Sequence, residues 1–498
     1  MTTTAPIPTS DTVETHGLLL DGQRVTTTSQ GLYPHVFPGD GRVNAEVAMA
    51  GPTEIDQAVA SAAAAQKAWI ALPVDLRRDM LLKLSDLIQA EIPALAALSV
   101  ADNGVASAIS AVHPFWMARW FRYYAGWIDK LAGQVPPVSY SGDLNIISEE
   151  PYGVVGVIVP WNGPMVMIGM AVAPALAAGN AVVIKPPELA PLTTLRFGEL
   201  ALEAGLPPGL VNVVPGDHVG GEALVRHPGV GKIHFTGSGA TARKIHLAAV
   251  DTLTPVATEL GGKSANLVFA DTDLDTAVML SSFIGPLAQS GQNCACGSRI
   301  LVEDSIYDQF VEKAGAFISQ AVVGDPFDAK TLVGPVIAES ALDRILGVVE
   351  TARSTGSGRL VTGGGRLGGS LADGFFIEPT LFADVDNASP LNQQETFGPV
   401  VSVSRFSDEE EAVALANDTS YGLVSYVQTN DLRRAHRVSR ALQSGSVYVN
   451  TFSDLVPSAP YGGFKQSGEG RLGGLEGLRE FSRPKNVRIG MEPPALPA

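Results

Sequence analysis

The sequence predicts an α/β protein built around a doubly wound parallel sheet with helices on both faces. Short apolar runs alternate with helical stretches between residues 153 and 262. The apolar runs are VVGVIVP, AVVIKP, LVNVVPG, KIHFTGS and PVATELGG, and the helical stretches between them are 164–178, 194–204, 221–226 and 240–250. This strand–helix–strand alternation favours right-handed crossovers and ligand binding at the carboxyl ends of the strands. A chain of 498 residues is also long enough for two or three domains.

Composition excludes several classes of protein. Hydrophobic residues make up 45% of the chain and charged residues 17%, which is typical of a well-packed globular protein. The formal net charge of −17 argues against nucleic acid as a partner. Two cysteines two positions apart cannot build a disulfide framework, and residues 1–16 lack the basic and apolar regions of a signal peptide. We therefore expect a cytoplasmic protein.

One uncharged stretch, residues 151–184, is long enough to cross a bilayer. It is interrupted by Pro160, Pro164, Pro174, Gly179 and Asn180. Punctuated apolar runs of this kind are typical of buried strands and a buried helix. We expect no membrane span.

The first 128 residues supply supporting elements. Residues 1–16 are predicted to be a mobile polar tail, followed by a first strand from Leu18 to Val25 around an Asp21-Gly22 turn. Thr53 is predicted to cap a helix that ends at Trp69, and a second helix is expected over 74–90. Seven aromatic residues between 115 and 127 recur at helical spacing, which favours helix packing over a ligand-stacking surface.

The segment GSGATA, from Gly237 to Ala242, matches the dinucleotide fingerprint G-x-G-x-x-[GA] between a strand and a helix. About twenty residues later an acid that binds the ribose is expected, and Glu259 nearly fits. However, the fingerprint ordinarily follows the first strand, and here it follows the fourth. Lys185 and Glu188, after an earlier strand, offer another ribose clamp, which would leave Glu259 free for a different role.

The only two cysteines, Cys294 and Cys296, lie in GQNCACGSR. A helix is predicted over 273–289, so Cys294 would follow it on a loop. A thiol acts as a nucleophile only as thiolate, which backbone N–H groups or a neighbouring base could stabilise. Alternatively, both cysteines are small buried hydrophobes.

Seven motifs, in order and at consistent spacing, resemble those of the NAD(P)-dependent aldehyde dehydrogenase superfamily. They are Pro160-Trp161-Asn162, Lys185-Pro186-Pro187-Glu188, Phe235-Thr236-Gly237-Ser238, Glu259-Leu260-Gly261-Gly262-Lys263, Gly291-Gln292-Asn293-Cys294, Glu395-Thr396-Phe397-Gly398-Pro399 and Pro460-Tyr461-Gly462-Gly463-Phe464-Lys465. The resemblance covers essentially the whole chain beyond the tail.

The resemblance implies a catalytic trio. Cys294 would add to the aldehyde carbon to give a thiohemiacetal, and loss of hydride to the nicotinamide would leave a thioester. Glu259 would activate the water that hydrolyses this thioester. The amide of Asn162 and the N–H of Cys294 would hold the oxyanion.

The resemblance also implies the cofactor site. Lys185 and Glu188 would bind the adenosine ribose, Gly237 and Ser238 the pyrophosphate, and Glu395 the nicotinamide ribose, with Phe397 packing beside it. Pro160, Trp161 and Leu260 complete the predicted set. NAD is favoured over NADP, because the Glu188 carboxylate would repel a 2′-phosphate. The 8 histidines show no ligand spacing, so no metal site is expected.

The resemblance also implies a substrate pocket, which comprises Gly163, Val166, Met167, Met170, Asn293, Ala295, Leu455 and Tyr461. The loop 450–461 resembles the segment that closes the family's substrate tunnel. Met and aliphatic walls adapt to apolar shapes, so we expect a fairly bulky aromatic, terpenoid or medium-chain aldehyde.

Three departures from the family pattern bear on substrate and rate. Gly163 stands where many members have an aromatic residue, and Cys296 stands where a small residue is frequent. Ala171 and Leu475 occupy positions where a Lys and a Glu commonly form a proton relay. These three departures leave the predicted reaction type unchanged.

The family's domain plan places an NAD-binding domain at 1–128 and 150–260, an α/β catalytic domain at 261–462, and a small β oligomerisation arm at 129–149 and 463–498. Such arms pair between subunits, so a homodimer or homotetramer is expected.

Two competing functions stay open: a non-catalytic cofactor-binding relative, and a cysteine-dependent esterase or acyl hydrolase.

Overall fold

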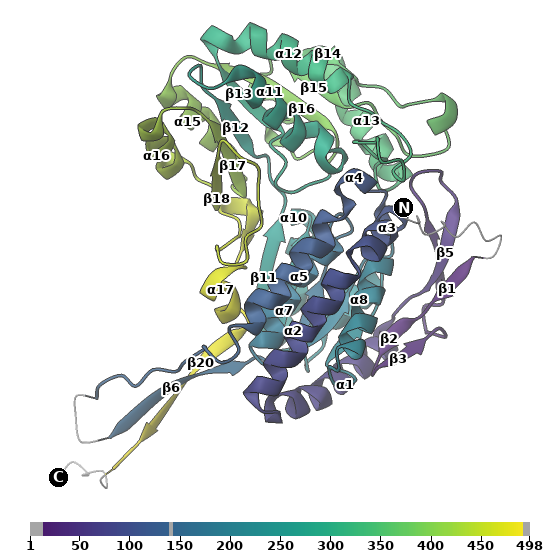
Figure 1. The fold of residues 1–498 in the computed structure, drawn as a ribbon, viewed down its shortest axis with the longest axis vertical. Helices are drawn as coiled ribbons and strands as arrows, with labels where there is room; N and C mark the ends of the chain where they lie inside the picture. The colour runs from purple at the N-terminus through teal and green to yellow at the C-terminus, as the bar shows by residue number, and fades with distance from the viewer. Residues whose placement is uncertain (1–12, 139–142, 492–498) are drawn as a thin grey trace.

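The structure, a computed structural model, describes residues 13–138 and 143–491. It contains two α/β bodies and a two-stranded ribbon that projects away from them (Figure 1). The predicted fold class, with two α/β domains and a small β arm, is confirmed.

The first body is built on an eight-stranded sheet in the order β19-β11-β10-β7-β8-β9-β2-β3. Its central five strands are parallel, and they are the five apolar runs predicted from the sequence. The chain fills β7, β8 and β9 on one side and then crosses to β10 and β11 on the other, so the strand order reverses between β7 and β10. The strand bounds are β2 Leu18–Leu20, β3 Gln23–Val25, β7 Val154–Ile158, β8 Ala181–Lys185, β9 Val211–Val213, β10 Lys232–Gly237, β11 Val256–Leu260 and β19 Gly468–Glu469.

Helices cover this sheet because their apolar faces and the apolar strands bury one another in one large core cluster. They are α1 Pro52–Ala71, α2 Val74–Ala90, α3 Ile92–Asn103, α4 Ser107–Ser110, α5 Val112–Ala125, α6 Pro164–Met167, α7 Ala173–Ala177, α8 Leu192–Glu203, α9 His218–Arg226 and α10 Gly239–Ala249. A π-helical turn, Ile168–Val172, joins α6 to α7. Trp120, Phe121 and Tyr124 of α5 are at most 1% exposed, which confirms that these aromatics serve packing.

The second body lies at the top of Figure 1 and contains a seven-stranded sheet in the order β14-β15-β16-β13-β12-β17-β18. Its strands are β12 Ala265–Val268, β13 Arg299–Glu303, β14 Arg359–Thr362, β15 Thr380–Ala383, β16 Val400–Phe406, β17 Val424–Gln428 and β18 Ser446–Val449. Its helices are α11 Leu274–Ser282, α12 Tyr307–Ser319, α13 Glu339–Ser354, α14 Pro390–Gln393, α15 Glu409–Asn417 and α16 Leu432–Ala441. All these elements fall within the predicted range 261–462.

The projecting arm pairs β6, Leu144–Pro151, with β20, Ser482–Ile489, in antiparallel register. The predicted bridging range 463–498 is too broad, because β19 pairs with β11 of the first sheet and α17, Gly474–Arg479, contacts α7.

A third small sheet joins β1 Glu14–His16, β5 Val43–Ala48 and β4 Leu32–Val36. The predicted mobile tail is therefore too long, since residues 14–16 pair with β5; residues 1–12 lie outside the described part.

Two predicted helix boundaries are also wrong. The first long helix begins at Pro52 with Gly51 as its cap, and Glu54 Oε2 accepts a hydrogen bond from Gly51 N at 2.9 Å. Thr53 therefore lies inside the first turn. The helix predicted over 273–289 stops at Ser282, because Gly285 (φ −89°, ψ −106°) and Pro286, which lacks an N–H, break the regular pattern.

Within the described residues, no single helix is long and apolar enough to cross a membrane, although the bent pair α2 and α3 would pass on length and composition. The uncharged stretch 151–184 forms β7, the helical segment 164–177 and β8.

Candidate active site

The loop that carries Cys294 is rigidly placed by hydrogen bonds around it. Asn293 Oδ1 accepts from Ala295 N at 2.9 Å, and Tyr426 Oη donates to Ala295 O at 2.8 Å. Asn162 Nδ2 donates to Gln292 O at 2.9 Å, which ties the end of β7 to this loop. Within the described residues, the main-chain N–H of Cys294 donates to no protein acceptor. An unused N–H beside a thiol can stabilise an oxyanion that forms at the sulfur-bound carbon.

The two cysteines have different environments. Cys294 is half-buried and lines a cavity of about 1190 Å³ between the two bodies. Cys296 is buried, does not line this cavity, and its Sγ donates to Gly285 O at 3.1 Å. Cys296 therefore matches the alternative reading, a small buried residue, whereas Cys294 does not.

Burial, together with the negative charges of Glu395 and Glu259, raises the pKa of the Cys294 thiol to about 12, while the Tyr461 hydroxyl and the Ala295 N–H oppose this shift. The thiol is consequently neutral at pH 7 and must lose its proton as it attacks. The side chain of Tyr461 is almost fully buried beside it.

Glu259, on β11, is only 5% exposed, lines the same cavity, and its Oε2 has no hydrogen-bond partner within the described residues. Burial raises its pKa well above the ordinary value; Arg471 opposes this shift and Glu480 adds to it. A buried carboxyl with a raised pKa and a free oxygen is suited to take a proton from water near pH 7.

The cavity runs along the carboxyl ends of β7, β8, β10 and β11, where the strand order reverses. It is lined by all nine predicted cofactor residues, namely Pro160, Trp161, Lys185, Glu188, Gly237, Ser238, Leu260, Glu395 and Phe397, as well as by Asn162, Glu259 and Cys294. The cavity thus brings together side chains from distant parts of the sequence.

The structural details of this cavity fit an elongated anionic cofactor. Ser238 Oγ caps α10 by accepting a hydrogen bond from Thr241 N at 3.2 Å. No atom lies within 4 Å of the position that a Cβ on the next residue, Gly239, would occupy. A helix N-terminus with open space in front of it suits a pyrophosphate. At the β8 end, burial lowers the pKa of Lys185 to about 8, and its Nζ donates to Gly216 O and Pro186 O.

At the opposite end, Glu395 Oε1 accepts from Gly262 N at 3.0 Å, and burial raises the pKa of Glu395 to about 6. Phe397 has φ +47° and packs edge-to-face against Trp161, with ring centroids 5.3 Å apart. Arg344, which the sequence reasoning missed, lines the cavity and holds this segment by donating to Thr396 O at 2.6 Å. No local motif marked Arg344, because it lies on α13, far from Glu395 in sequence.

The predicted substrate residues are not among those that line this cavity. None of Gly163, Val166, Met167, Met170, Asn293, Ala295, Leu455 and Tyr461 lines it. Val166, Met167 and Met170 are at most 9% exposed, and Leu455 O accepts from Trp120 Nε1 at 3.0 Å. Ala171 is buried in the same core, and Leu475 packs against it.

The sequence reasoning also missed His113, which lies near the predicted substrate residue Gly163. A side chain on Gly163 would lie 3.7 Å from Val166 and 4.0 Å from the His113 ring. His113 Nε2 lies 2.9 Å from Gln289 Nε2, and Gln289 in turn donates to Asn162 O at 3.1 Å. Burial lowers the pKa of His113 to about 4, so this ring is neutral at pH 7.

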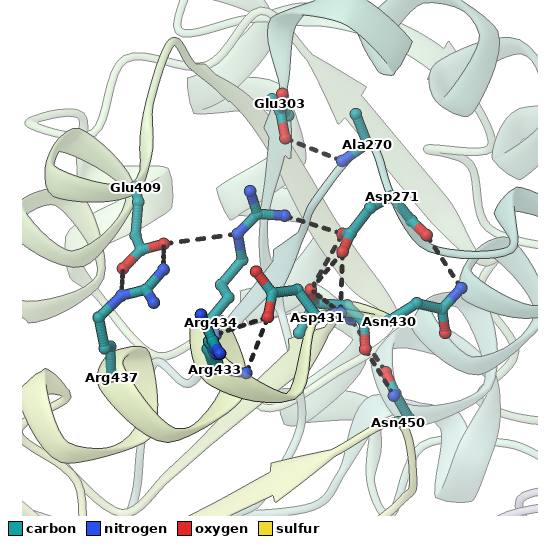
Figure 2. A network of polar contacts seen from close by, with 11 residues as sticks. Ala270, Asp271, Glu303, Glu409, Asn430, Asp431, Arg433, Arg434, Arg437 and Asn450 are labelled. Carbon is teal, nitrogen blue, oxygen red and sulfur yellow. Dashed lines mark hydrogen bonds and ion pairs between the residues drawn. The ribbon is translucent and has the colours of Figure 1, made fainter.

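The loop 450–461 is anchored by a polar network in the second body (Figure 2). Asn450 exchanges two hydrogen bonds with the main chain of Thr429, at 3.0 and 2.7 Å. Asp271, just after β12, accepts from Thr429 Oγ1, Asp431 N and Arg434 Nη1, each at 2.9 Å. The start of the loop is therefore fixed to the end of β17. Among the described residues, no group of three or more His, Cys, Asp or Glu could hold a metal ion.

Comparisons with known proteins agree with this geometry. Residues 25–487 match the model of the aldehyde dehydrogenase family. The mitochondrial aldehyde dehydrogenase of Homo sapiens is 41% identical over 469 residues, which cover 93% of this chain and 89% of the relative.

Two solved structures are similar over nearly their whole length. A putative aldehyde dehydrogenase from Burkholderia cenocepacia has a TM-score of 0.94 at 41% identity, covering 97% of this chain and 99% of that chain. PnpE from Pseudomonas sp. WBC-3, solved in complex with nicotinamide adenine dinucleotide, has a TM-score of 0.94 at 40% identity with the same coverage. Fold, site and similarity over almost the entire chain together place this protein in the aldehyde dehydrogenase family.

Proposed function

We propose that this aldehyde dehydrogenase oxidises an apolar aldehyde to the carboxylic acid with NAD, through a thioester on Cys294 that water hydrolyses. The observation that carries the proposal is the convergence of Cys294, Glu259 and Asn162 at one end of a cavity whose remaining length suits a dinucleotide. The bound NAD would accept the hydride. An esterase would not need the part of the cavity that suits a dinucleotide, and a non-catalytic relative would not need Cys294, Glu259 and Asn162 together.

The residues act in sequence. The Cys294 sulfur attacks the aldehyde carbon, and the thiol proton leaves to a neighbouring carboxylate. The Cys294 N–H, and the Asn162 amide after it turns from Gln292 O, stabilise the negative oxygen that develops. After hydride loss, Glu259 takes a proton from water as the water oxygen adds to the thioester carbonyl. Departure of the Cys294 thiolate releases the acid.

The first prediction concerns the cofactor. Glu188 lies at the Lys185 end of the cavity, where its carboxylate can accept from a ribose 2′-hydroxyl and repel a 2′-phosphate. We expect a higher kcat/KM with NAD than with NADP, and we expect Glu188→Gln to narrow the ratio by about tenfold, because it removes one like charge. Initial-rate kinetics with both cofactors measure this. Glu222→Gln is the matched control, since Glu222 also lines the cavity but is paired with Arg226. Preference of the unmodified enzyme for NADP would contradict the prediction.

The second prediction concerns the substrate. The aliphatic and Met side chains after Asn162 carry no charge, Gly163 is small and the nearby His113 is neutral at pH 7, so none of these residues would pair with an acidic group on the substrate. We therefore expect the best kcat/KM with bulky aromatic, terpenoid or medium-chain aldehydes. A panel of aldehydes assayed by the absorbance of reduced cofactor tests this together with the activity itself.

Gly163→Phe should narrow the space in front of Val166. Efficiency with a bulky aldehyde should then fall about tenfold or more, because changing even one apolar contact in a substrate site alters efficiency by about 10–200-fold. Acetaldehyde serves as the internal control and should be little affected. A best efficiency with a carboxylated semialdehyde or with betaine aldehyde would overturn the proposed substrate class.

We also propose a cytoplasmic homodimer or homotetramer assembled through the β6–β20 arm. The arm projects from the body and has only two strands, and an isolated two-stranded ribbon is marginally stable in water (Figure 1). Its exposed Leu144, Val487 and Ile489 would gain cover from a second subunit. A mass measured by light scattering that equals one chain would contradict the assembly.

A further inference from the structure

A cationic side chain, Arg471, approaches Glu259 from the side of Gly462. A Cβ placed on Gly462 would lie 2.9 Å from Glu259 Oε1 and 3.0 Å from Arg471 Nη1. Both atoms therefore border the small space that this glycine leaves open. The pairing of Tyr461 N with Leu472 O, and of Leu472 N with Tyr461 O, holds the two chain segments together.

The positive charge of Arg471 is held by neutral groups. Its Nη1 donates to Gly463 O at 3.1 Å and to Gly470 O at 2.5 Å, and its guanidinium lies 5.5 Å from the centroid of the Phe464 ring. Carbonyl oxygens and an aromatic face satisfy hydrogen-bonding groups without cancelling a full charge. The field of the guanidinium is therefore available to Glu259.

Glu480 and Lys232 fix this arrangement from behind. Glu480 Oε2 accepts from Arg471 N at 3.1 Å, and Glu480 Oε1 accepts from Lys232 Nζ at 2.6 Å. Lys232 begins β10, the strand next to the β11 strand that carries Glu259. Because Lys232 pairs with Glu480, this carboxylate offsets only part of the field that Arg471 exerts on Glu259.

We propose that Arg471 is a positioning residue whose charge favours the ionised form of the Glu259 carboxylate, the form that acts as a base. The inference rests on the role proposed above for Glu259. The other titratable groups that face Glu259 are Cys294, Tyr461 and Glu480. Arg471 is the one cation among these described neighbours, and it lowers the pKa of Glu259 against the effect of burial.

An arginine does not give up or take up protons in proteins, so Arg471 acts through its charge and not as a relay. Ala171 is buried in the apolar core and Leu475 packs against that core, so neither of these residues supplies a charge to Glu259. The charge that favours the ionised form of Glu259 comes instead from Arg471, which follows Gly470 in the chain.

The test uses a reaction that needs no cofactor. An activated ester, 4-nitrophenyl acetate, acylates the Cys294 thiol and releases nitrophenolate, and hydrolysis of the resulting thioester is the step that Glu259 would assist. The deacylation rate is measured against pH for the unmodified enzyme and for Arg471→Met, Arg471→Lys and Glu480→Gln.

Loss of an opposite charge about 4–6 Å away raises a carboxyl pKa by about one unit or more. The midpoint of the rising limb should therefore move to higher pH in Arg471→Met, with about a tenfold loss of rate below it and recovery in alkali. Arg471→Lys should keep the midpoint close to that of the unmodified enzyme. Glu480→Gln removes a like charge and should move the midpoint to lower pH.

The opposite signs are decisive, because a loosened fold would lower the rate at every pH without moving the midpoint. Absence of a shift, or shifts of the same sign in Arg471→Met and Glu480→Gln, would overturn the inference. If Arg471→Met does not fold, the downward shift in Glu480→Gln and the retained midpoint in Arg471→Lys decide. If Glu259→Gln leaves the deacylation profile unchanged, the proposed role of Glu259 fails, and this inference fails with it.

Discussion

Cys294→Ala should lower aldehyde oxidation by at least about three orders of magnitude, because it removes the atom to which the substrate carbon is proposed to bond. Steady-state turnover with NAD and the best aldehyde of the panel measures the loss. The cofactor should still bind, since the cavity is lined mainly by other residues. Fluorescence titration with NAD checks that the variant is folded.

Cys296→Ala is the matched control. Cys296 lies two residues away, is buried, and donates only to Gly285 O. Its loss removes a small buried side chain and one weak hydrogen bond, so turnover should stay within a few-fold of normal while stability falls by about 1 kcal/mol. Near-normal turnover in Cys294→Ala, or a collapse of turnover in Cys296→Ala alone, would refute the assignment.

Glu259→Gln should lower steady-state turnover by about 10²–10⁴-fold, the usual contribution of a general base, and leave hydride transfer largely intact. A pre-steady-state burst of reduced cofactor of about one equivalent per site should therefore persist. Rapid mixing followed by absorbance measures the burst and the slow phase separately.

The same experiment on the unmodified enzyme tests which step limits turnover. Burial raises the pKa of Glu259 well above its ordinary value, so this carboxyl keeps its proton to a higher pH than an exposed carboxyl would. Ala171 and Leu475 provide no charged route for returning that proton to solvent, and water in the cofactor tunnel is the simplest alternative path. We expect a burst, and little isotope effect from a deuterated aldehyde on the steady-state rate.

A full primary isotope effect without a burst would show that hydride transfer limits turnover. A burst that disappears in Glu259→Gln would instead place Glu259 before hydride transfer, as the base that accepts the Cys294 proton. Persistence or loss of the burst in Glu259→Gln therefore distinguishes the two roles that the geometry permits for the Glu259 carboxylate.

Much of the fold was predictable because local patterns are unambiguous where residues are buried on both sides. The five central strands of the first sheet, the turn at Asp21-Gly22 and the helix Val74–Ala90 all occur where the sequence predicts them. Predictions failed where a backbone detail overrides the pattern. Pro52 moves a helix start ahead of Thr53, and Gly285 with Pro286 ends a helix whose apolar spacing continues to Gln289.

Sequence by itself determined the fold class and the family, because seven motifs in order, each placed after a strand or on a loop, carry that information without coordinates. It also left two readings of the cysteines open, since spacing alone cannot distinguish a reactive thiol from a buried one. Only the tertiary structure decided between them, by placing Cys294 on the cavity and Cys296 against Gly285 O. Likewise, Lys232, Arg471 and Glu480, the charged groups arranged around Glu259 on β11, come from β10 and from the chain after Gly470. Electrostatic contacts of this kind depend on distance in space, which a linear pattern does not contain.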